Sequence, residues 1–256
     1  MSPISLVPPP AAPAAMARRA GRWLLLLTLQ ALLLAWLFRA NWANGWTWVL
    51  GDRYDSLIEV SILEHWFNTL RGLAQWSSVN YFYPYSNTLG YNDGYLAYGL
   101  IYSAARAAGA DMLISAMVVN MVMKAAGFGA FYLCARRMLG LGFGYALLGA
   151  AIFELSNNLA LHALHAQLLA VAFVPLAALL LHGAVGAALR NAPRALLCHG
   201  AAFAVLYGLW AMTAYYMLWF FSFYTLLFLG AMALLRPGLR ERLKAAPLKT
   251  VPAVGD

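Results

Sequence analysis

Residues 51–72 read GDRYDSLIEVSILEHWFNTLRG, and this polar stretch separates the first apolar run of the chain from all later ones. Together with the NDG sequence at 92–94, it contains five of the nine acidic residues: Asp52, Asp55, Glu59, Glu64 and Asp93. The whole chain of 256 residues is 63% hydrophobic and only 10% charged. A chain this apolar that gathers its carboxylates in one segment is expected to use them there.

The composition indicates a membrane protein. Several apolar runs approach the ~20 residues needed to cross a bilayer, and the mean hydropathy of +0.68 is too high for a soluble core. The formal charge of +8 comes from basic residues that lie between hydrophobic runs, which is the positive-inside pattern and not a nucleic-acid-binding face. Cys134 and Cys198 match no metal or redox spacing, so we interpret them as packing residues.

We predict an all-α, polytopic membrane protein with about six transmembrane helices and one or two membrane-surface helices in a long first outer loop, residues 40–111. The expected spans are the apolar runs 23–38, 112–135, 143–161, 167–189, 195–212 and 215–235. Residues 1–17 are predicted to be a disordered cytoplasmic tail, residues 18–235 the transmembrane module, and residues 236–256 a basic cytoplasmic tail. A cleaved signal peptide is the alternative for the first run, which is long for that purpose.

The orientation depends on residues 95–109. If this segment spans the membrane, most later basic residues lie outside. If it is a re-entrant or amphipathic helix at the outer leaflet, twelve of the 17 basic residues are cytoplasmic. The positive-inside rule favours the second arrangement, with both chain ends in the cytoplasm.

The first candidate site is the start of the polar stretch. Asp52, Asp55 and Glu59 have the spacing i, i+3, i+7 and share one face of an amphipathic surface helix. Asp52 and Asp55 could bind a divalent cation (Mg²⁺ or Mn²⁺) through their oxygens, or one could act as a general base. The structural alternative is that one aspartate caps the helix while Glu59 is merely solvated.

A second polar cluster follows the third predicted span. Glu154 lies within an apolar run, and Lys124 is charged in the middle of another, so they either serve a site or simply pair. His162 and His165 have a spacing that suits a metal, but no third ligand is near; contact with a phosphate or sugar, or a plain interfacial loop, fits better. Asp93 either caps the segment that follows it or joins the site. The predicted substrate-binding residues are Arg53, Glu59, His65, Asp93, Lys124, Glu154, His162 and His165.

Several segments together resemble a known enzyme family. The sequences GDRYD, ILEHWF, YFYP, NTLGYNDGYLAYGLIY and HAQLLAVAFVPL are similar to segments of bacterial multi-spanning proteins regarded as glycosyltransferases. The order of span, acidic loop, surface helix, Tyr-Pro segment and short helix resembles the N-terminal module of the polytopic GT-C glycosyltransferases. The resemblance covers residues 23–181.

This resemblance implies an enzyme of the bacterial cytoplasmic membrane that moves a sugar from a polyprenyl-phosphate donor to a glycan, lipid or protein acceptor on the outer face. The family's first-loop acid maps onto Asp52 or Asp55, as base or metal ligand. Its second acidic position has no Asp here, and Glu154 or the His162–His165 pair would replace it. Members of the family usually have more spans, so the chain would be a fragment, a truncated homologue or a subunit that needs a partner.

Two other functions stay open. Charges within spans, such as those of Lys124 and Glu154, are also typical of a transporter or flippase for a lipid-linked or anionic substrate. Against a transporter, the sequence has neither repeated halves nor a pair of broken helices. A non-catalytic membrane subunit is the third possibility.

Overall fold

The computed structural model describes residues 13–47, 54–156 and 165–236, together with Gly238 and Glu241. These residues form helices and no strands, which confirms the predicted all-α fold. The elements are α1 (Pro13–Leu37), α2 (Arg39–Ala43), α3 (Asp55–Leu70), η1 (Asn80–Phe82), η2 (Leu89–Tyr91), α4 (Leu96–Ala107), α5 (Met112–Arg137), α6 (Phe143–Glu154), η3 (Ala166–Ala172), α8 (Phe173–Leu189), α9 (Pro193–Ala211) and α10 (Tyr215–Leu235).

Five of the described helices are long and apolar enough to cross a membrane: Ala15–Leu37, Met112–Arg137, Ala166–Leu189, Pro193–Ala211 and Tyr215–Leu235. The protein is therefore a multi-pass membrane protein. The predicted span 143–161 is represented by α6, an apolar helix of 12 residues. At ~1.5 Å per residue α6 covers only about 18 Å, which is less than the bilayer core, and the end of the predicted span lies outside the described residues.

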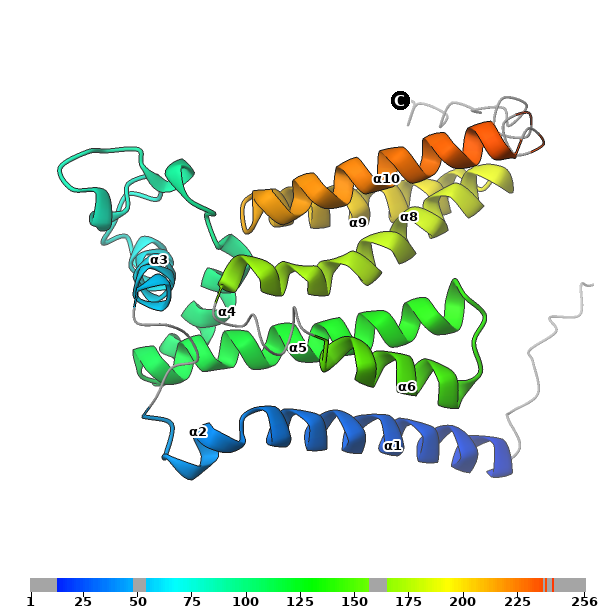
Figure 1. Ribbon diagram of the computed structural model, residues 1–256, viewed down its shortest axis with the longest axis horizontal. Helices are drawn as coiled ribbons and strands as arrows, with labels where there is room; N and C mark the ends of the chain where they lie inside the picture. The colour runs from blue at the N-terminus through cyan, green and yellow to red at the C-terminus, as the bar shows by residue number, and fades with distance from the viewer. Residues whose placement is uncertain (1–12, 48–53, 157–164, 237, 239–240, 242–256) are drawn as a thin grey trace, which may run out of the picture.

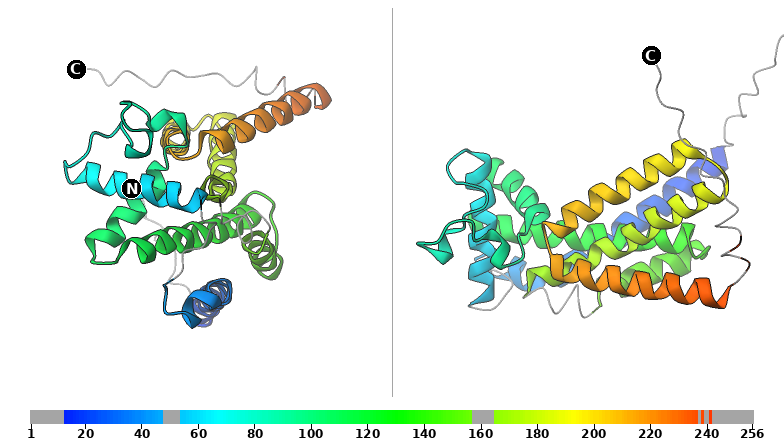
Figure 2. Two further views of the ribbon diagram at one scale, coloured as in Figure 1. Left: turned by 60° about the vertical axis from the view of Figure 1, so that its left-hand side comes forward. Right: turned by 90° about the horizontal axis from the view of Figure 1, so that it is seen from above.

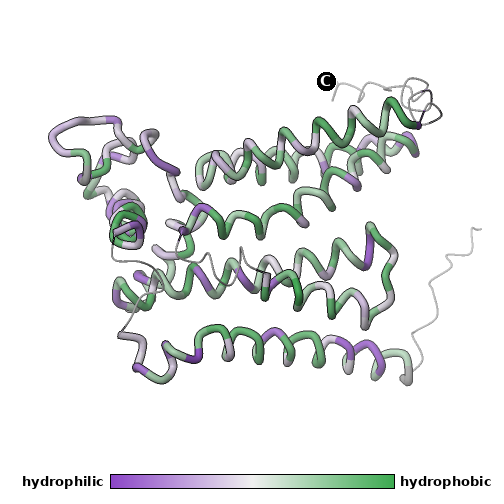
Figure 3. The backbone as a smooth tube through the Cα atoms, viewed as in Figure 1, coloured by the Kyte–Doolittle hydropathy of each residue, from purple (hydrophilic) through white to green (hydrophobic). Residues whose placement is uncertain are grey.

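The long helices run side by side, and they alternate in direction along the chain (Figures 1 and 2). Residues 54–111, η3 and the α9–α10 turn lie at one end, which we call the loop end (Figure 1). At the other end, the basic end, α1 begins and α10 ends (Figure 1). Figure 3 shows the apolar residues along the spans and a hydrophilic patch where α1 begins. The side of the membrane that each end faces follows from the charge pattern and remains a prediction.

Local sequence explains several helix ends. Asp111 caps α5, and its Oδ1 accepts the backbone N–H of Ile114 at 2.8 Å. Arg136 and Arg137 end the same helix, where cations complement the helix dipole. Pro193 is the first residue of α9, a position at which proline needs no hydrogen-bond donor.

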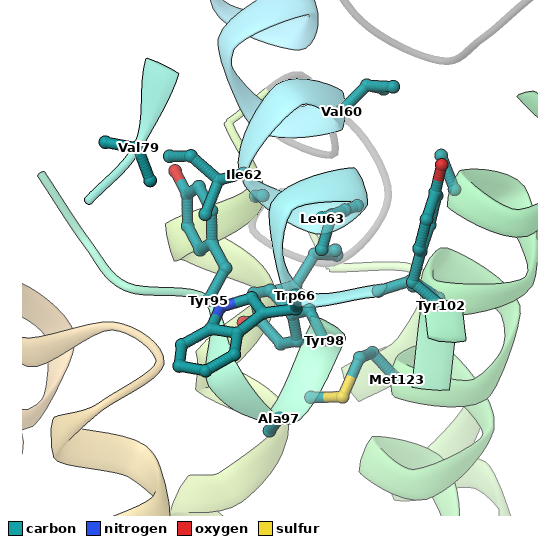
Figure 4. Close-up of a cluster of buried hydrophobic side chains, with 14 of the residues drawn as sticks. Val60, Ile62, Leu63, Trp66, Val79, Tyr95, Ala97, Tyr98, Tyr102 and Met123 are labelled. Carbon is teal, nitrogen blue, oxygen red and sulfur yellow. The ribbon is translucent and has the colours of Figure 1, made fainter. Parts of the chain in front are cut away.

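The surface helix predicted from the polar stretch is α3, which crosses the direction of the spans at the loop end (Figure 2). It packs on α4 and α5 through a buried apolar cluster that includes Trp66, Tyr98, Tyr102 and Met123 (Figure 4). The helices approach closely at Gly99, where an added Cβ would overlap the ring of Trp66. Alanine or any larger residue would push α3 away from α4.

The α9–α10 turn holds the loop end together. The backbone N–H of Tyr95 donates to the carbonyl of Thr213 at 3.0 Å, and that of Leu96 donates to the carbonyl of Met212 at 3.1 Å. The N–H of Ala97 donates to Oγ1 of Thr213 at 2.9 Å. These bonds satisfy N–H groups that the first turn of α4 cannot pair internally, and they join the first loop to the last two spans.

Large apolar side chains on α1 and α10 face outward. Leu24, Trp219 and Leu226 are each about two-thirds or more exposed. In each of the two helices, only 6% of the most apolar 18-residue stretch is buried. In water such faces would be unfavourable, whereas lipid tails are as apolar as the side chains themselves. The spans therefore contact membrane lipids.

Candidate functional site

The loop end brings Asp55 and His165 together, although they lie on different elements. Asp55 is the first residue of α3, where the helix dipole favours a carboxylate, and His165 directly precedes η3. Nδ1 of His165 lies 3.1 Å from Oδ2 of Asp55. The side chain of His165 is 39% exposed and that of Asp55 is 52% exposed, so this carboxylate–imidazole pair can be reached by a ligand.

Glu59 lies one turn after Asp55 on α3 and lines the same small cavity, as the predicted common face required. The cavity has a volume of about 120 Å³ and is lined by Asp55, Ile58, Glu59, Asn92, Tyr95, His165, Ala166 and Gln167. Glu59 is only 5% exposed, so the alternative that it is merely solvated is wrong. Burial raises the pKa of Glu59 to about 8. The carboxyl is therefore largely protonated at neutral pH and can donate a hydrogen bond.

Tyr95 and Gln167 complete one wall of this cavity, and neither was among the predicted site residues. The hydroxyl of Tyr95 donates to Oε1 of Gln167 at 3.0 Å. Tyr95 has φ +50, a left-handed conformation that is rare for a bulky residue and is held here by its backbone bond to Thr213. The sequence signal was the polar NDG segment directly before it, whose turn residues mark a change in chain direction.

Asp93 is not among the residues that line this cavity, and the prediction that it caps α4 is wrong. Residue Tyr95 occupies the cap position of α4 and makes no side-chain cap bond. Burial raises the pKa of Asp93, and hydrogen bonds from the backbone N–H groups of Tyr216 and Tyr215 partly offset this effect. Asp93 therefore faces the beginning of α10, where a carboxylate complements the helix dipole, and it ties the first loop to the last span.

His65 and Glu64 serve the packing of the loop end. Nε2 of His65 lies 3.0 Å from the carbonyl oxygen of Trp76, and His65 does not line the polar cavity. Glu64 accepts bonds from the Tyr102 hydroxyl at 2.6 Å and from Nε of Arg106 at 3.1 Å, so it is not simply solvated. This group joins α3 to α4 and holds the helix that carries Asp55 in place.

Lys124 and Glu154 are buried deeper in the bundle, 1% and 0% exposed. Oε1 of Glu154 accepts from Nε2 of Gln30 on α1 at 2.8 Å. The Lys124 amine and Oε2 of Glu154 have no hydrogen-bond partner among the described residues, so the predicted pair makes no direct hydrogen bond there. The two opposite charges nevertheless attract each other. Neither residue lines the polar cavity.

Three predicted site residues, Asp52, Arg53 and His162, lie outside the described residues. Within the part of the chain that is described, no group of three or more His, Cys, Asp or Glu side chains could hold a metal ion. Among the predicted site residues that the structure describes, Asp55, Glu59 and His165 are the ones that lie together at one cavity.

Comparison with protein-family models, with curated proteins and with solved structures finds no match for this chain. The resemblance to glycosyltransferases that the sequence indicates stays a prediction.

Proposed function

We propose that this protein is a membrane glycosyltransferase that moves a sugar from a polyprenyl-phosphate donor to an acceptor hydroxyl at the loop end of the bundle. The observation that supports this proposal is the Asp55–His165 contact of 3.1 Å beside a buried Glu59. An ionisable pair next to a carboxyl of strongly raised pKa is typical of a catalytic site. By the charge pattern, the loop end faces the outside of a bacterial cytoplasmic membrane.

In this proposal Asp55 orients His165 through the 3.1 Å contact between them. The neutral imidazole accepts the proton of the acceptor hydroxyl, whose oxygen forms a bond to the anomeric carbon of the sugar. The bond from that carbon to the donor phosphate oxygen breaks, and polyprenyl phosphate leaves with the bonding electrons. Protonated Glu59 donates a hydrogen bond to charge that develops on the sugar or phosphate oxygens.

The proposed mechanism does not use a divalent cation, and whether Mg²⁺ or Mn²⁺ contributes is left to experiment. Asp55 is the one predicted metal ligand among the described residues, and its carboxylate lies against an imidazole. The described donor set does not fit a metal centre, and the steps above therefore use the chain's own residues. Chelation with EDTA in the transfer assay measures whether a cation contributes.

The test is sugar transfer from a radiolabelled polyprenyl-phosphate sugar in proteoliposomes, with a panel of acceptors. Asp55→Asn and His165→Ala should each lower the rate by about 10²–10⁴-fold, which is the usual contribution of a general base. The double variant should be little worse than either single one, because the two residues act as a unit. Asp111→Asn is the matched control, since asparagine also caps α5. Full activity in the Asp55→Asn variant would exclude this mechanism.

A transporter or flippase is the second candidate, and one observation favours it. The Lys124 amine is buried among spans and has no hydrogen-bond partner among the described residues, a feature of ion or substrate pathways. Lys124→Met would abolish flipping of a fluorescent polyprenyl-phosphate lipid by a transporter, whereas a glycosyltransferase that acts at the loop end would keep its transfer activity.

A further inference from the structure

A second cavity opens at the loop end, directly beside the polar cavity. Its volume of about 450 Å³ is within the range of roughly 300–1,000 Å³ that is usual for ligand sites. Residues from the first loop and from the α9–α10 turn line it, among them Trp76, Ser77, Asn87, Gly90, Asn92 and Tyr215. Asn92 lines both cavities, so a ligand in the larger one lies against a wall of the Asp55–His165 site.

The lining combines exposed aromatic rings with neutral hydrogen-bonding groups. Trp76 and Tyr215 are 55% and 45% exposed, so much of each ring is uncovered. Oγ of Ser77 donates to Oδ1 of Asn87 at 2.7 Å, which uses the amide oxygen of Asn87 and leaves its NH₂ group as a donor. None of the lining residues is acidic or basic. A charged ligand would find no counter-charge here, whereas a neutral one that is apolar on its faces and hydroxylated at its edges would find both kinds of partner.

The cavity is held in shape from two sides. The backbone N–H of Leu89 donates to the carbonyl of Ser77 at 2.9 Å, which closes the loop that carries Asn87. On the other side, Gly94 packs so tightly on the α9–α10 turn that an added Cβ would lie 2.7 Å from the carbonyl oxygen of Met212. A site formed in advance in this way binds with little ordering of the protein.

We propose that this cavity binds an uncharged sugar unit, with its ring against Trp76 and Tyr215 and its hydroxyl groups bonded to Asn87 and Asn92. The inference rests on the proposed function and deepens it, because it assigns the sugar a place next to the catalytic pair. The same chemistry is available from a free saccharide and from the sugar headgroup of a lipid, and the experiment separates these two sources.

The experiment measures binding to the full chain in phosphatidylcholine nanodiscs by saturation-transfer NMR. The soluble probes are maltose and N,N′-diacetylchitobiose, and the lipid probe is monoglucosyl diacylglycerol added to the nanodisc. The principal variant is Gly90→Val, because Gly90 lines the cavity and an added Cβ there would meet no protein atom within 4 Å. Gly144→Val is the matched control, since Gly144 has equally open surroundings but lies at the start of α6.

We expect at least one probe to bind to wild type and to Gly144→Val, and Gly90→Val and Trp76→Ala to weaken that binding at least tenfold. Binding of a soluble probe indicates a free saccharide, and binding of the glycolipid alone indicates a membrane-borne sugar. Absence of binding by all three probes, or binding that Gly90→Val leaves unchanged, overturns the inference. If probes bind in this Gly90-dependent way but no sugar is transferred, the proposed function fails and the sugar site stands.

Discussion

The buried carboxyl of Glu59 predicts how the stability of the protein depends on pH. Burial raises its pKa from the ordinary 4.5 to about 8, so between these values the folded chain holds a proton that the unfolded chain has released. Stability contributed by this proton is complete below pH 4.5 and is lost as the pH rises towards 8. At 1.36 kcal/mol per pKa unit, the loss is on the order of 3 kcal/mol at pH 7 and 5 kcal/mol above pH 8.

Glu59→Gln has nearly the same shape as protonated glutamate and cannot lose a proton. The variant should therefore match wild type near pH 4.5 and exceed its stability by about 3 kcal/mol at pH 7. Thermal unfolding in detergent, followed by intrinsic fluorescence from pH 5 to 9, measures the difference. If Glu59 acts as a neutral hydrogen-bond donor, the variant should also keep its transfer activity at pH 7.

The matched control is Glu64→Gln, the same substitution on the same helix. Glu64 accepts bonds from Tyr102 and Arg106, so its loss should destabilise the protein by about 1–3 kcal/mol at pH 7. The two variants are thus expected to change stability in opposite directions. A Glu59→Gln protein that melts below wild type at pH 8, or whose advantage does not grow with pH, would refute this account of the buried carboxyl.

Three further predictions concern the bundle itself. Gly99→Ala should lower stability by about 1–3 kcal/mol in the same unfolding assay, because its Cβ would overlap the Trp66 ring; Gly129→Ala, with open space at that position, should not. Thr213→Val removes the acceptor of a backbone N–H at the start of α4 and should cost about 1–3 kcal/mol and speed amide exchange there. Lys124→Met removes a buried amine that has no hydrogen-bond partner among the described residues, so its melting temperature should equal or exceed that of wild type. A lower melting temperature would mean that the amine has a stabilising partner.

Much of the fold could be predicted because its signals are local. The length and hydropathy of the apolar runs predicted the spans, since each run needs only enough residues to cross the bilayer. The polar stretch predicted a surface helix, and α3 is that helix. The spacing of Asp55 and Glu59 placed them on one face, and both line the polar cavity. The predicted span at 143–161 is the exception, because only its apolar first part is described as α6.

The site could be predicted only in part, because its contacts join distant segments. Asp93 has the sequence context of a cap for the segment that follows it, but it faces the start of α10 once the first loop docks on the α9–α10 turn. Lys124 and Glu154 suggested a pair of opposite charges, and the two do attract each other, but the hydrogen bond of Glu154 comes from Gln30, a residue of α1 that no charge pattern singled out. Side-chain packing among three helices decides such contacts, and a one-dimensional pattern does not record it.

The sequence by itself determined that this protein lies in a membrane and that its carboxylates gather in one segment. Hydropathy and charge are properties of each residue and can be read without the fold. Tertiary structure alone decided that His165 contacts Asp55, that Glu59 is buried beside them, and that Asn92 lines two cavities. These properties depend on how α3, η3 and the α9–α10 turn pack around one another. The physical reason is that burial and proximity, which set both the pKa of Glu59 and the chemistry of the pair, exist only after the loop end has closed.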